Sequence, residues 1–212
     1  MNKSIAILAA SAVLTGSAFA STLYLNPWNG GDNAYSSQND TGGGNGNFAT
    51  VYVGFNATGT INEAAWVGEY FNPQTQGPIT GFTLGFYSDN AGTVGSLVSS
   101  QHFNGTSGET SLGVSANGYP QFVYDQVLNS GVAWNGDGWL AIVPDLAFPP
   151  QWGLCEGTSG PLAYQDFFGS RSQLGTSIAL ALGGDTAVPE PASMAALGLG
   201  VATLIRRRAK KA

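Results

Sequence analysis

The chain has 212 residues, of which 31 are glycine and only 9% are charged. Six of its seven Lys and Arg residues stand near the two ends, so residues 21–187 hold Arg171 alone against twelve carboxylates, a formal charge of −11. Binding of nucleic acid needs clustered Lys and Arg, so this charge excludes a nucleic-acid partner. It also disfavours anionic lipid or anionic polysaccharide, unless divalent cations bridge the charges.

The first twenty residues have the three parts of a secretory signal peptide. A short positive start, Met1–Lys3, precedes the apolar run Ile5–Leu14. Small residues follow at Ala18 and Ala20, which is the spacing of a signal-peptidase site. The sequence therefore predicts cleavage between Ala20 and Ser21 and export of the remaining chain.

Residues 21–187 are predicted to form one all-β domain. They contain few of the Lys, Arg and Glu residues that fill helix surfaces, and their short aromatic and β-branched runs alternate with turn residues. This spacing is typical of a β-sandwich or barrel. Asn29–Asn47, rich in Gly, Asn, Asp and Ser, is predicted to be a long exposed loop. Ten strands are predicted, at Thr22–Leu25, Ala49–Phe55, Ala64–Phe71, Ile79–Tyr87, Ser96–Phe103, Gln121–Leu128, Trp139–Val143, Gln151–Glu156, Ala163–Phe168 and Ser177–Leu182.

Alternation of apolar and polar residues is clearest in Ile79–Tyr87, where Phe82, Leu84 and Phe86 point to one face. The same period-two pattern in the other strands supplies further inward-facing side chains. The predicted core consists of Val51, Val53, Phe82, Leu84, Phe86, Ile142, Ile178 and Leu180.

A turn at Ser88–Gly92 should bring Ser96–Phe103 back beside this strand. The whole segment Ile79–Leu97 is similar to the strand–turn–strand hairpin of jelly-roll sandwich modules on extracellular bacterial proteins, some of which bind carbohydrate. The Pro-Gly that usually follows that turn is replaced here by Val94 and Gly95. The resemblance implies a single jelly-roll-like β-sandwich.

One cysteine, Cys155, is present in the predicted exported body, so no internal disulfide can form there. Its neighbours Trp152–Leu154 indicate a strand, and Cys155 is predicted to be a small buried apolar residue. A catalytic thiol needs a base, and His102 is the only histidine. The sequence does not show whether these two residues meet.

Oxygen-bearing side chains in several predicted turns have the chemistry of calcium ligands. The candidates for a metal site are Asp89, Asn90 and Asp137. Asp and Asn are also ordinary turn formers, so the same residues fit a purely structural role. Apart from this possible calcium ion, no cofactor is predicted.

Three tryptophans lie in or beside predicted loops that are rich in Asn, Gln and Gly, namely Trp28, Trp134 and Trp152. An exposed indole beside polar groups can stack on a sugar ring, whereas a buried one plugs the core. Both interpretations stay open for these residues. Trp66 and Trp139 lie inside predicted strands and are assigned to the core.

The C-terminal segment has a rigid motif, an apolar run and a basic end, in that order. Val188, Pro189, Glu190 and Pro191 form an extended peptide, because the two prolines block helix and sheet. The uncharged run at residues 192–205 would make a helix of about 21 Å, short for a bilayer core of about 30 Å. The positive-inside rule places the basic residues that follow in the cytoplasm, and these are Arg206, Arg207 and Arg208.

This arrangement resembles the PEP-CTERM sorting signal of Gram-negative bacteria, over residues 188–212. The resemblance implies recognition by an exosortase, a membrane protease or transpeptidase, with processing near Pro189-Glu190-Pro191. It also implies an inner-membrane-anchored precursor, later release to the cell surface or medium, and an association with exopolysaccharide or biofilm.

Three functions stay open for residues 21–187. The first is a non-enzymatic, monomeric protein of the envelope or extracellular matrix. The second is a carbohydrate-binding module, with or without calcium. The third is a secreted hydrolase, although the sequence has no Gly-rich phosphate loop, no histidine cluster and no Gly-x-Ser-x-Gly motif. A carboxylate pair in a deep groove would favour the hydrolase, and a flat aromatic face would favour the carbohydrate-binding module.

Overall fold

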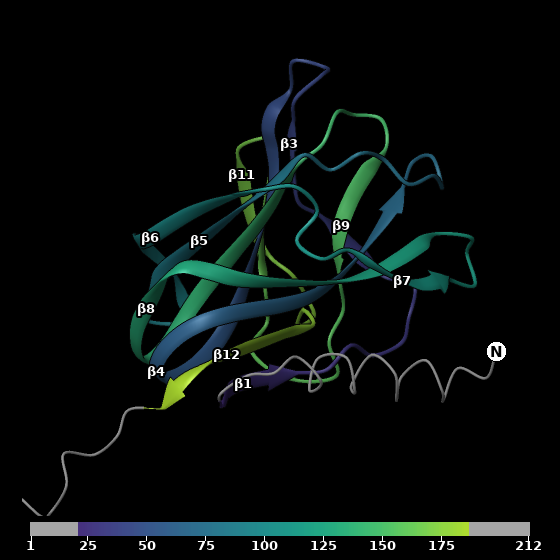
Figure 1. Ribbon diagram of the computed structural model, residues 1–212. Coiled ribbons are helices and arrows are strands. Elements are labelled where there is room, and N and C mark those ends of the chain that lie inside the picture. The colour runs from purple at the N-terminus through teal and green to yellow at the C-terminus, as the bar shows by residue number, and fades with distance from the viewer. Residues whose placement is uncertain (1–20, 187–212) are drawn as a thin grey trace, which may run out of the picture.

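A computed structural model describes residues 21–186, which consist of strands and the turns between them (Figure 1). This part of the chain contains no helix long and apolar enough to cross a membrane, and the predicted membrane segment at 192–205 lies outside it. The strands are β1 Thr22–Asn26, β2 Ala34–Ser36, β3 Gln38–Asp40, β4 Gly46–Phe71, β5 Gly81–Asn90, β6 Thr93–Asn104, β7 Thr110–Val114, β8 Pro120–Asp145, β9 Gln151–Cys155, β10 Tyr164–Phe167, β11 Ser170–Gln173 and β12 Leu180–Thr186.

Two strands of 26 residues each, β4 and β8, run antiparallel through the middle of the sheet. Their register shifts between Ile61 and Glu63, whose partners on β8 are Val132 and Val127. The extra residues on β8 form a bulge, and a bulge bends and twists the strand that carries it. The bend divides β4 and β8 into two halves each.

The two halves belong to two layers of one folded sheet. In the first layer, the early half of β4 and the late half of β8 lie among β10, β11, β5 and β6. In the second layer, the other halves lie among β12, β1, β9, β2 and β7. The ring of Phe82 on β5 packs across the interior against Trp66, Tyr124 and Trp152, with centroids 5.2, 5.2 and 5.6 Å away.

The all-β prediction is therefore confirmed for the described residues. The pairings give one continuous sheet rather than two separate ones, and they do not confirm a jelly-roll order of strands.

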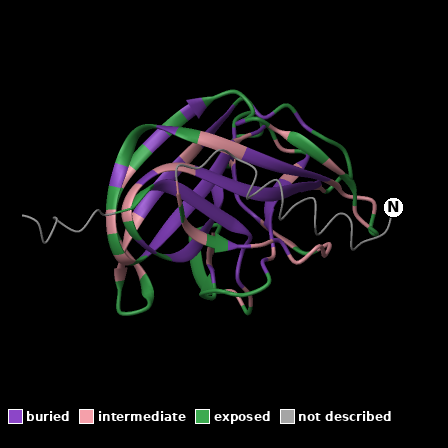
Figure 2. Cartoon of the chain, turned by 60° about the horizontal axis from the view of Figure 1, so that its bottom comes forward, coloured by how far each residue is buried: buried purple, intermediate pink, exposed green. Residues whose placement is uncertain are grey.

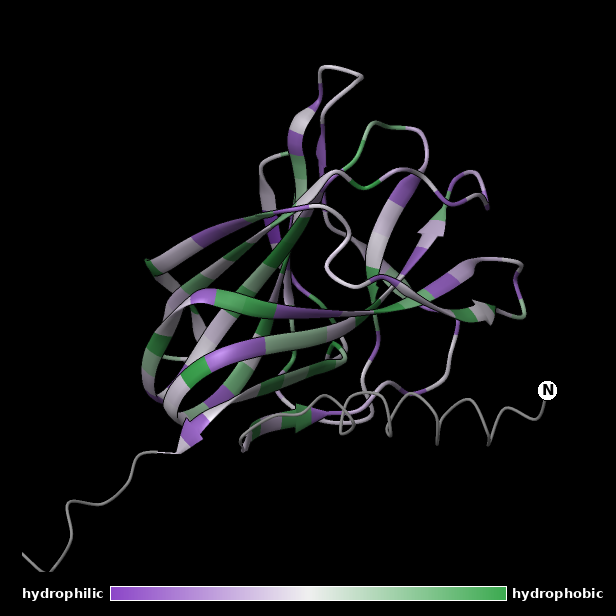
Figure 3. Cartoon of the chain, viewed as in Figure 1, coloured by the Kyte–Doolittle hydropathy of each residue, from purple (hydrophilic) through white to green (hydrophobic). Residues whose placement is uncertain are grey.

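All eight predicted core residues are buried in a single apolar cluster between the layers. Buried positions run along the interior strands while loops and edge strands are exposed (Figure 2). Hydrophobic and hydrophilic bands alternate along several strands in Figure 3, as period-two patterning requires. Trp66 and Cys155 are buried too, as predicted.

Several strand boundaries were predicted wrongly. The two segments at 49–55 and 64–71 are one strand, β4, because the polar stretch between them pairs with β8 on one side and, from Gly59 onward, with β12 on the other. The segments at 121–128 and 139–143 are likewise parts of β8. Strands β7 and β11 were missed because both are short and mostly exposed, β11 with no apolar residue and β7 with only Leu112 and Val114.

The predicted exposed loop at 29–47 is also wrong, since it contains β2, β3 and buried polar residues. Ser37 donates to the carbonyl of Ile142 at 2.5 Å and accepts from the amide of Val51 at 3.1 Å. Gln38 donates its side-chain amide to the carbonyls of Leu146 and Pro150 at 2.9 and 3.1 Å. These polar side chains satisfy backbone groups inside the fold, so a polar composition did not mean exposure here.

Candidate functional site

The outer face of the first layer is hollowed where its outward-facing residues are small. Each strand of this layer sends alternate residues inward to the core and outward to this face. On β4, Val51 and Val53 point inward, so Tyr52 and Gly54 point outward. The same alternation on β5 turns Tyr87 outward while Phe86 fills the core.

Cross-strand register explains why the face is hollow. Tyr164, Tyr52, Ala141, Gly85 and Ser100 stand side by side on five neighbouring strands. The small residues in the middle of this row leave a trough between the tyrosines and the rim on β6. The trough has a volume of about 240 Å³. Its lining residues are Asn39, Asn47, Thr50, Tyr52, Thr83, Gly85, Tyr87, Ser100, Ala141, Val143 and Asp145.

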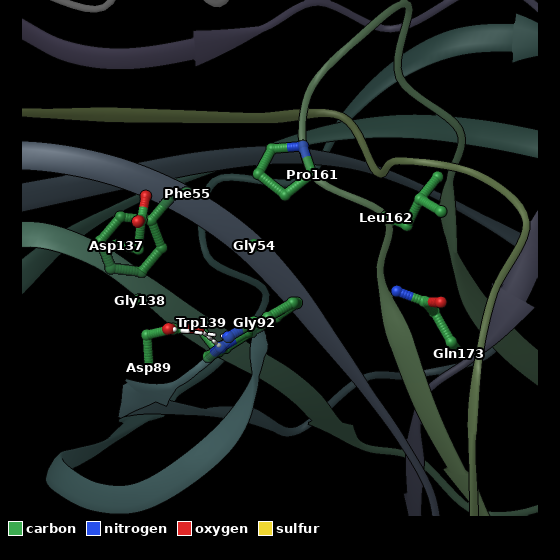
Figure 4. A pocket seen from close by; sticks show the side chains of 10 residues that line it. All are labelled: Gly54, Phe55, Asp89, Gly92, Asp137, Gly138, Trp139, Pro161, Leu162 and Gln173. Carbon is green, nitrogen blue, oxygen red and sulfur yellow. Dashed lines mark hydrogen bonds between the residues drawn. The ribbon is translucent and has the colours of Figure 1, made fainter.

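A second pocket of about 230 Å³ continues the trough, two residues further along β4, β5 and β8 (Figure 4). Pro161 packs over Gly54, where a Cβ atom would approach the proline Cβ to 2.6 Å. The two adjoining pockets are called the outer groove below. The second pocket is lined by Gly54, Phe55, Asp89, Gly92, Asp137, Gly138, Trp139, Pro161, Leu162 and Gln173.

Aromatic residues line the outer groove, among them Tyr52, Tyr87 and Trp139, and Tyr164 packs beside them. Tyr52 meets Tyr87 edge to face with centroids 5.3 Å apart, and Trp139 meets Tyr164 in the same way at 5.2 Å. Tyr87 and Tyr164 are half-buried, so part of each ring faces solvent, whereas Tyr52 and Trp139 are buried beneath them. Rings of this kind offer apolar faces beside hydrogen-bonding groups, which suits a sugar.

Arg171, the only cation of residues 21–186, stands beside the groove with its charge already engaged. Its guanidinium lies 4.6 Å above the Tyr52 ring and donates to both carboxylate oxygens of Asp166 at 2.7 Å. This bidentate pair raises the pKa of Arg171 and holds the pKa of Asp166 below its usual range. The arginine therefore orients Tyr52 rather than offering a free positive charge to a ligand.

Two of the three predicted metal ligands line the same pocket, which the sequence could not show. Asp89 accepts from the indole N–H of Trp139 at 3.0 Å and from the amide of Gly92 at 2.9 Å. Asp137 accepts from the side-chain amide of Asn56 at 2.7 Å. Asn90 lies at the exposed β5–β6 turn and does not line the pocket. Residues 21–186 contain no group of three or more His, Cys, Asp or Glu residues placed to hold a metal ion.

The three candidate tryptophans are not gathered at one site. Trp28 is 3% exposed and packs against Val67, Cys155 and Ala179, so its placement as a loop ligand is corrected. Trp134 is half-buried, lies 5.2 Å from the Phe55 ring and lines a shallow hollow at the other end of the layer.

Trp152 is also corrected, because it is fully buried on β9. Its indole N–H donates to the Tyr124 hydroxyl at 2.9 Å, and that hydroxyl donates to Glu109 at 2.8 Å. The indole N–H of Trp152 thus has a hydrogen-bond partner inside the fold, so this tryptophan does not need an exposed position.

Cys155 and His102 do not form a catalytic pair. Cys155 is wholly buried in the second layer, and burial raises the pKa of its thiol well above the usual value. His102 is exposed on β6, where it contacts Thr83 at 3.2 Å and Asp145 at 3.8 Å.

Sequence reasoning missed the tyrosines in and beside the groove, of which Tyr52 and Tyr87 line it and Tyr164 packs next to it. Tyr52, Tyr87 and Tyr164 lie on predicted strands, and their outward positions follow from the alternation that placed the core. What the sequence lacked was the register that brings three distant strands together.

Comparison with known proteins identifies the C-terminus. Residues 187–209 match the PEP-CTERM protein-sorting motif, so the chain carries this motif at its C-terminal end, as predicted. The motif supports an exported, exosortase-sorted protein that is first made as a membrane-anchored precursor and then processed. No curated protein and no solved structure shows significant similarity to the chain. The motif and the predicted signal peptide lie outside the described residues.

Proposed function

We propose that this protein is a non-enzymatic component of the cell envelope or extracellular matrix that binds neutral exopolysaccharide in its outer groove. The observation that carries the proposal is the groove itself, a trough with a small-residue floor, tyrosine sides and a polar rim. A polysaccharide chain needs apolar ring faces for its C–H surfaces and hydrogen-bonding groups for its hydroxyls. The sorting motif supports export to the place where such polymers accumulate.

The charge of the groove favours a neutral polymer over an acidic one. Asp89, Asp137 and Asp145 line it, and Arg171 is committed to Asp166. Carboxylates accept hydrogen bonds from sugar hydroxyls but repel uronate or phosphate groups. Asp89 is itself held by two protein donors, which supports a structural and binding role rather than proton transfer.

Affinity electrophoresis of the processed, exported protein through gels that contain neutral or acidic polysaccharide tests the proposal. We expect retardation by at least one neutral polymer and none by uronate polymers. Tyr87→Ala should reduce the retardation, because it removes a half-buried ring that lines the groove. Stacking of a nucleobase on an aromatic side chain contributes about 1–3 kcal/mol. If a sugar ring on Tyr87 gains an energy near the lower part of this range, the variant should lose about tenfold in affinity.

Phe168→Ala is the matched control, because Phe168 is 65% exposed and does not line the groove. Equal loss in both variants would contradict the proposal. Release of reducing ends from a bound polymer, abolished by Asp89→Asn, would instead establish the hydrolase.

A further inference from the structure

A separate pocket of about 410 Å³ lies at the far side of the second layer, between β2, the end of β4 and the loop before β8. Two carboxylates line it, Asp32 and Glu69. Three aromatic rings surround them, from Tyr35, Phe71 and Tyr119. None of its lining residues is shared with the outer groove.

Glu69 is only 2% exposed, yet it reaches this pocket from the end of β4. Its Oε2 accepts one hydrogen bond, from the Gln121 side chain at 3.0 Å, and that same amide also donates to the carbonyl of Gly31 at 2.9 Å. Oε1 receives no hydrogen bond from residues 21–186. Oε1 is not among the fully buried unpartnered atoms and Glu69 lines the pocket, so the protein leaves this oxygen open to a ligand or to solvent.

The surroundings of Glu69 also disfavour its ionised form. Burial and, to a smaller extent, the nearby charge of Asp32 raise the pKa of the Glu69 carboxyl to about 7, against the hydrogen bond from Gln121, which lowers it. The only Lys or Arg among the described residues is Arg171, which is paired on β11 and does not line this pocket. No Lys or Arg of residues 21–186 is therefore placed to neutralise these two carboxylates, which leaves them open to a cationic ligand.

The rings decide which positive group fits. A calcium ion takes six to eight oxygen ligands, and this pocket offers only two carboxylates among its lining side chains, with rings occupying much of the remaining wall. An organic ammonium group would be stabilised by both kinds of side chain in the pocket, because the carboxylates form ion pairs with it and the faces of the aromatic rings attract it. The side-chain amides of Asn33 and Asn117 at the rim can bind hydroxyls beside the ammonium.

We propose that this pocket binds the free ammonium group of an amino sugar, such as an unacetylated hexosamine residue of a polysaccharide. Glu69 and Asp32 pair with the ammonium, while Phe71 and Tyr119, whose centroids lie 6.2 Å apart, contact the sugar ring. The formal charge of −11 on residues 21–187 steers a cationic polymer towards the protein. The site is independent of the neutral-polymer groove proposed above.

Titration of the ¹⁵N-labelled exported protein at pH 7, followed by NMR, tests the proposal with three matched sugars. We expect glucosamine to shift signals around Glu69, and we expect glucose and N-acetylglucosamine to leave them unchanged. Glu69→Gln is isosteric and keeps an acceptor for Gln121, so it should fold normally and weaken glucosamine binding about tenfold. Asp185→Asn, which removes one exposed charge outside the pocket, should bind like the parent.

Three outcomes would overturn the proposal. Equal binding of N-acetylglucosamine would show that the pocket does not recognise the ammonium group. Displacement of glucosamine by millimolar calcium, with tighter calcium binding, would make the pocket a metal site. Stronger binding of Nα-acetyl-lysine amide than of glucosamine would point to a protein partner instead. A Tyr87→Ala variant that loses binding to the neutral polymer but still binds glucosamine would support this site and show that it is independent of the outer groove.

Discussion

Leu84 sits at the centre of the interior, between the two layers, and is completely buried. Truncation to alanine removes its contacts and leaves a cavity that the bent sheet cannot fully close. We expect Leu84→Ala to lower the free energy of unfolding by about 2–5 kcal/mol, measured by urea denaturation. Leu97→Ala, at a position that is 54% exposed, should change it by less than about 0.5 kcal/mol. Similar values for the two variants would contradict the core assignment.

Asp40 organises the tip of the β3–β4 hairpin. Its Oδ1 accepts from the amides of Gly43 and Phe148 at 2.7 and 3.0 Å, and its Oδ2 accepts from the side chain of Asn45 at 2.7 Å. These donors, first of all the Phe148 amide, hold the pKa of Asp40 well below its usual range. The native fold therefore favours the ionised form.

A pKa that is depressed on folding stabilises the protein above the unfolded pKa, about 3.9, and this stabilisation is lost as the pH falls below it. Asp40→Asn should lower the free energy of unfolding by about 1–3 kcal/mol at pH 7. The difference from the parent protein should shrink as the pH is lowered from about 4 towards 2. Urea denaturation across this range measures it, and a difference that does not change with pH would show that Asp40 acts through shape alone.

Pairing between β12 and β4 requires a glycine at the point where their register shifts. The register shifts between Gly183 and Gly184, and a Cβ atom on Gly184 would collide with the carbonyl oxygen of Thr60. Only glycine allows the two backbones to approach this closely at the bulge. This contact is part of what lets β12 follow the bend of β4 and close the second layer.

Gly184→Ala should therefore destabilise the protein by about 1–3 kcal/mol, because the strands must separate or the backbone must strain. Thermal unfolding followed by far-UV circular dichroism measures the loss. Gly175→Ala is the control, since nothing lies within 4 Å of its Cβ position. An unchanged melting temperature for Gly184→Ala would mean that the bulge is not required for the bend.

At the scale of the whole molecule, the folded body and the sorting motif are separate in the chain. The body closes with β12 at Thr186, and the matched motif begins at residue 187. Between the two layers, residues 21–186 already form a closed apolar core around Trp66, Phe82 and Leu84. Sorting and folding should therefore be separable by mutation.

Substitution of Pro189, Glu190 and Pro191 by alanine should block processing in a host with its exosortase and leave the fold unchanged. The precursor mass should persist in membrane fractions, as measured by mass spectrometry, while limited proteolysis of the body gives the parental pattern. Processing to the normal mature mass would contradict this prediction. N-terminal sequencing of the exported form checks cleavage after Ala20 in the same sample.

Features that depend on local or linear order could be predicted from the sequence alone. The sorting motif is a short linear pattern, and the all-β class follows from runs with a period of two. The inward positions of Val51, Leu84 and Ile142 needed only that alternation, because neighbouring residues of a strand point to opposite faces. The buried state of Cys155 was predicted from its strand-like neighbours Trp152–Leu154, and residues 152–155 are all buried.

Only the tertiary structure decided which distant residues meet. The outer groove needs Tyr52 opposite Tyr164 on β10 and Tyr87 two residues off this row on β5, and the pocket of the further inference needs Asp32 beside Glu69. The burial of Trp28 and Trp152 was hidden because loop-like neighbours say nothing of what packs over them. Pairing between strands is non-local, and a shift of one residue reverses every side chain, so no short stretch of sequence contains it.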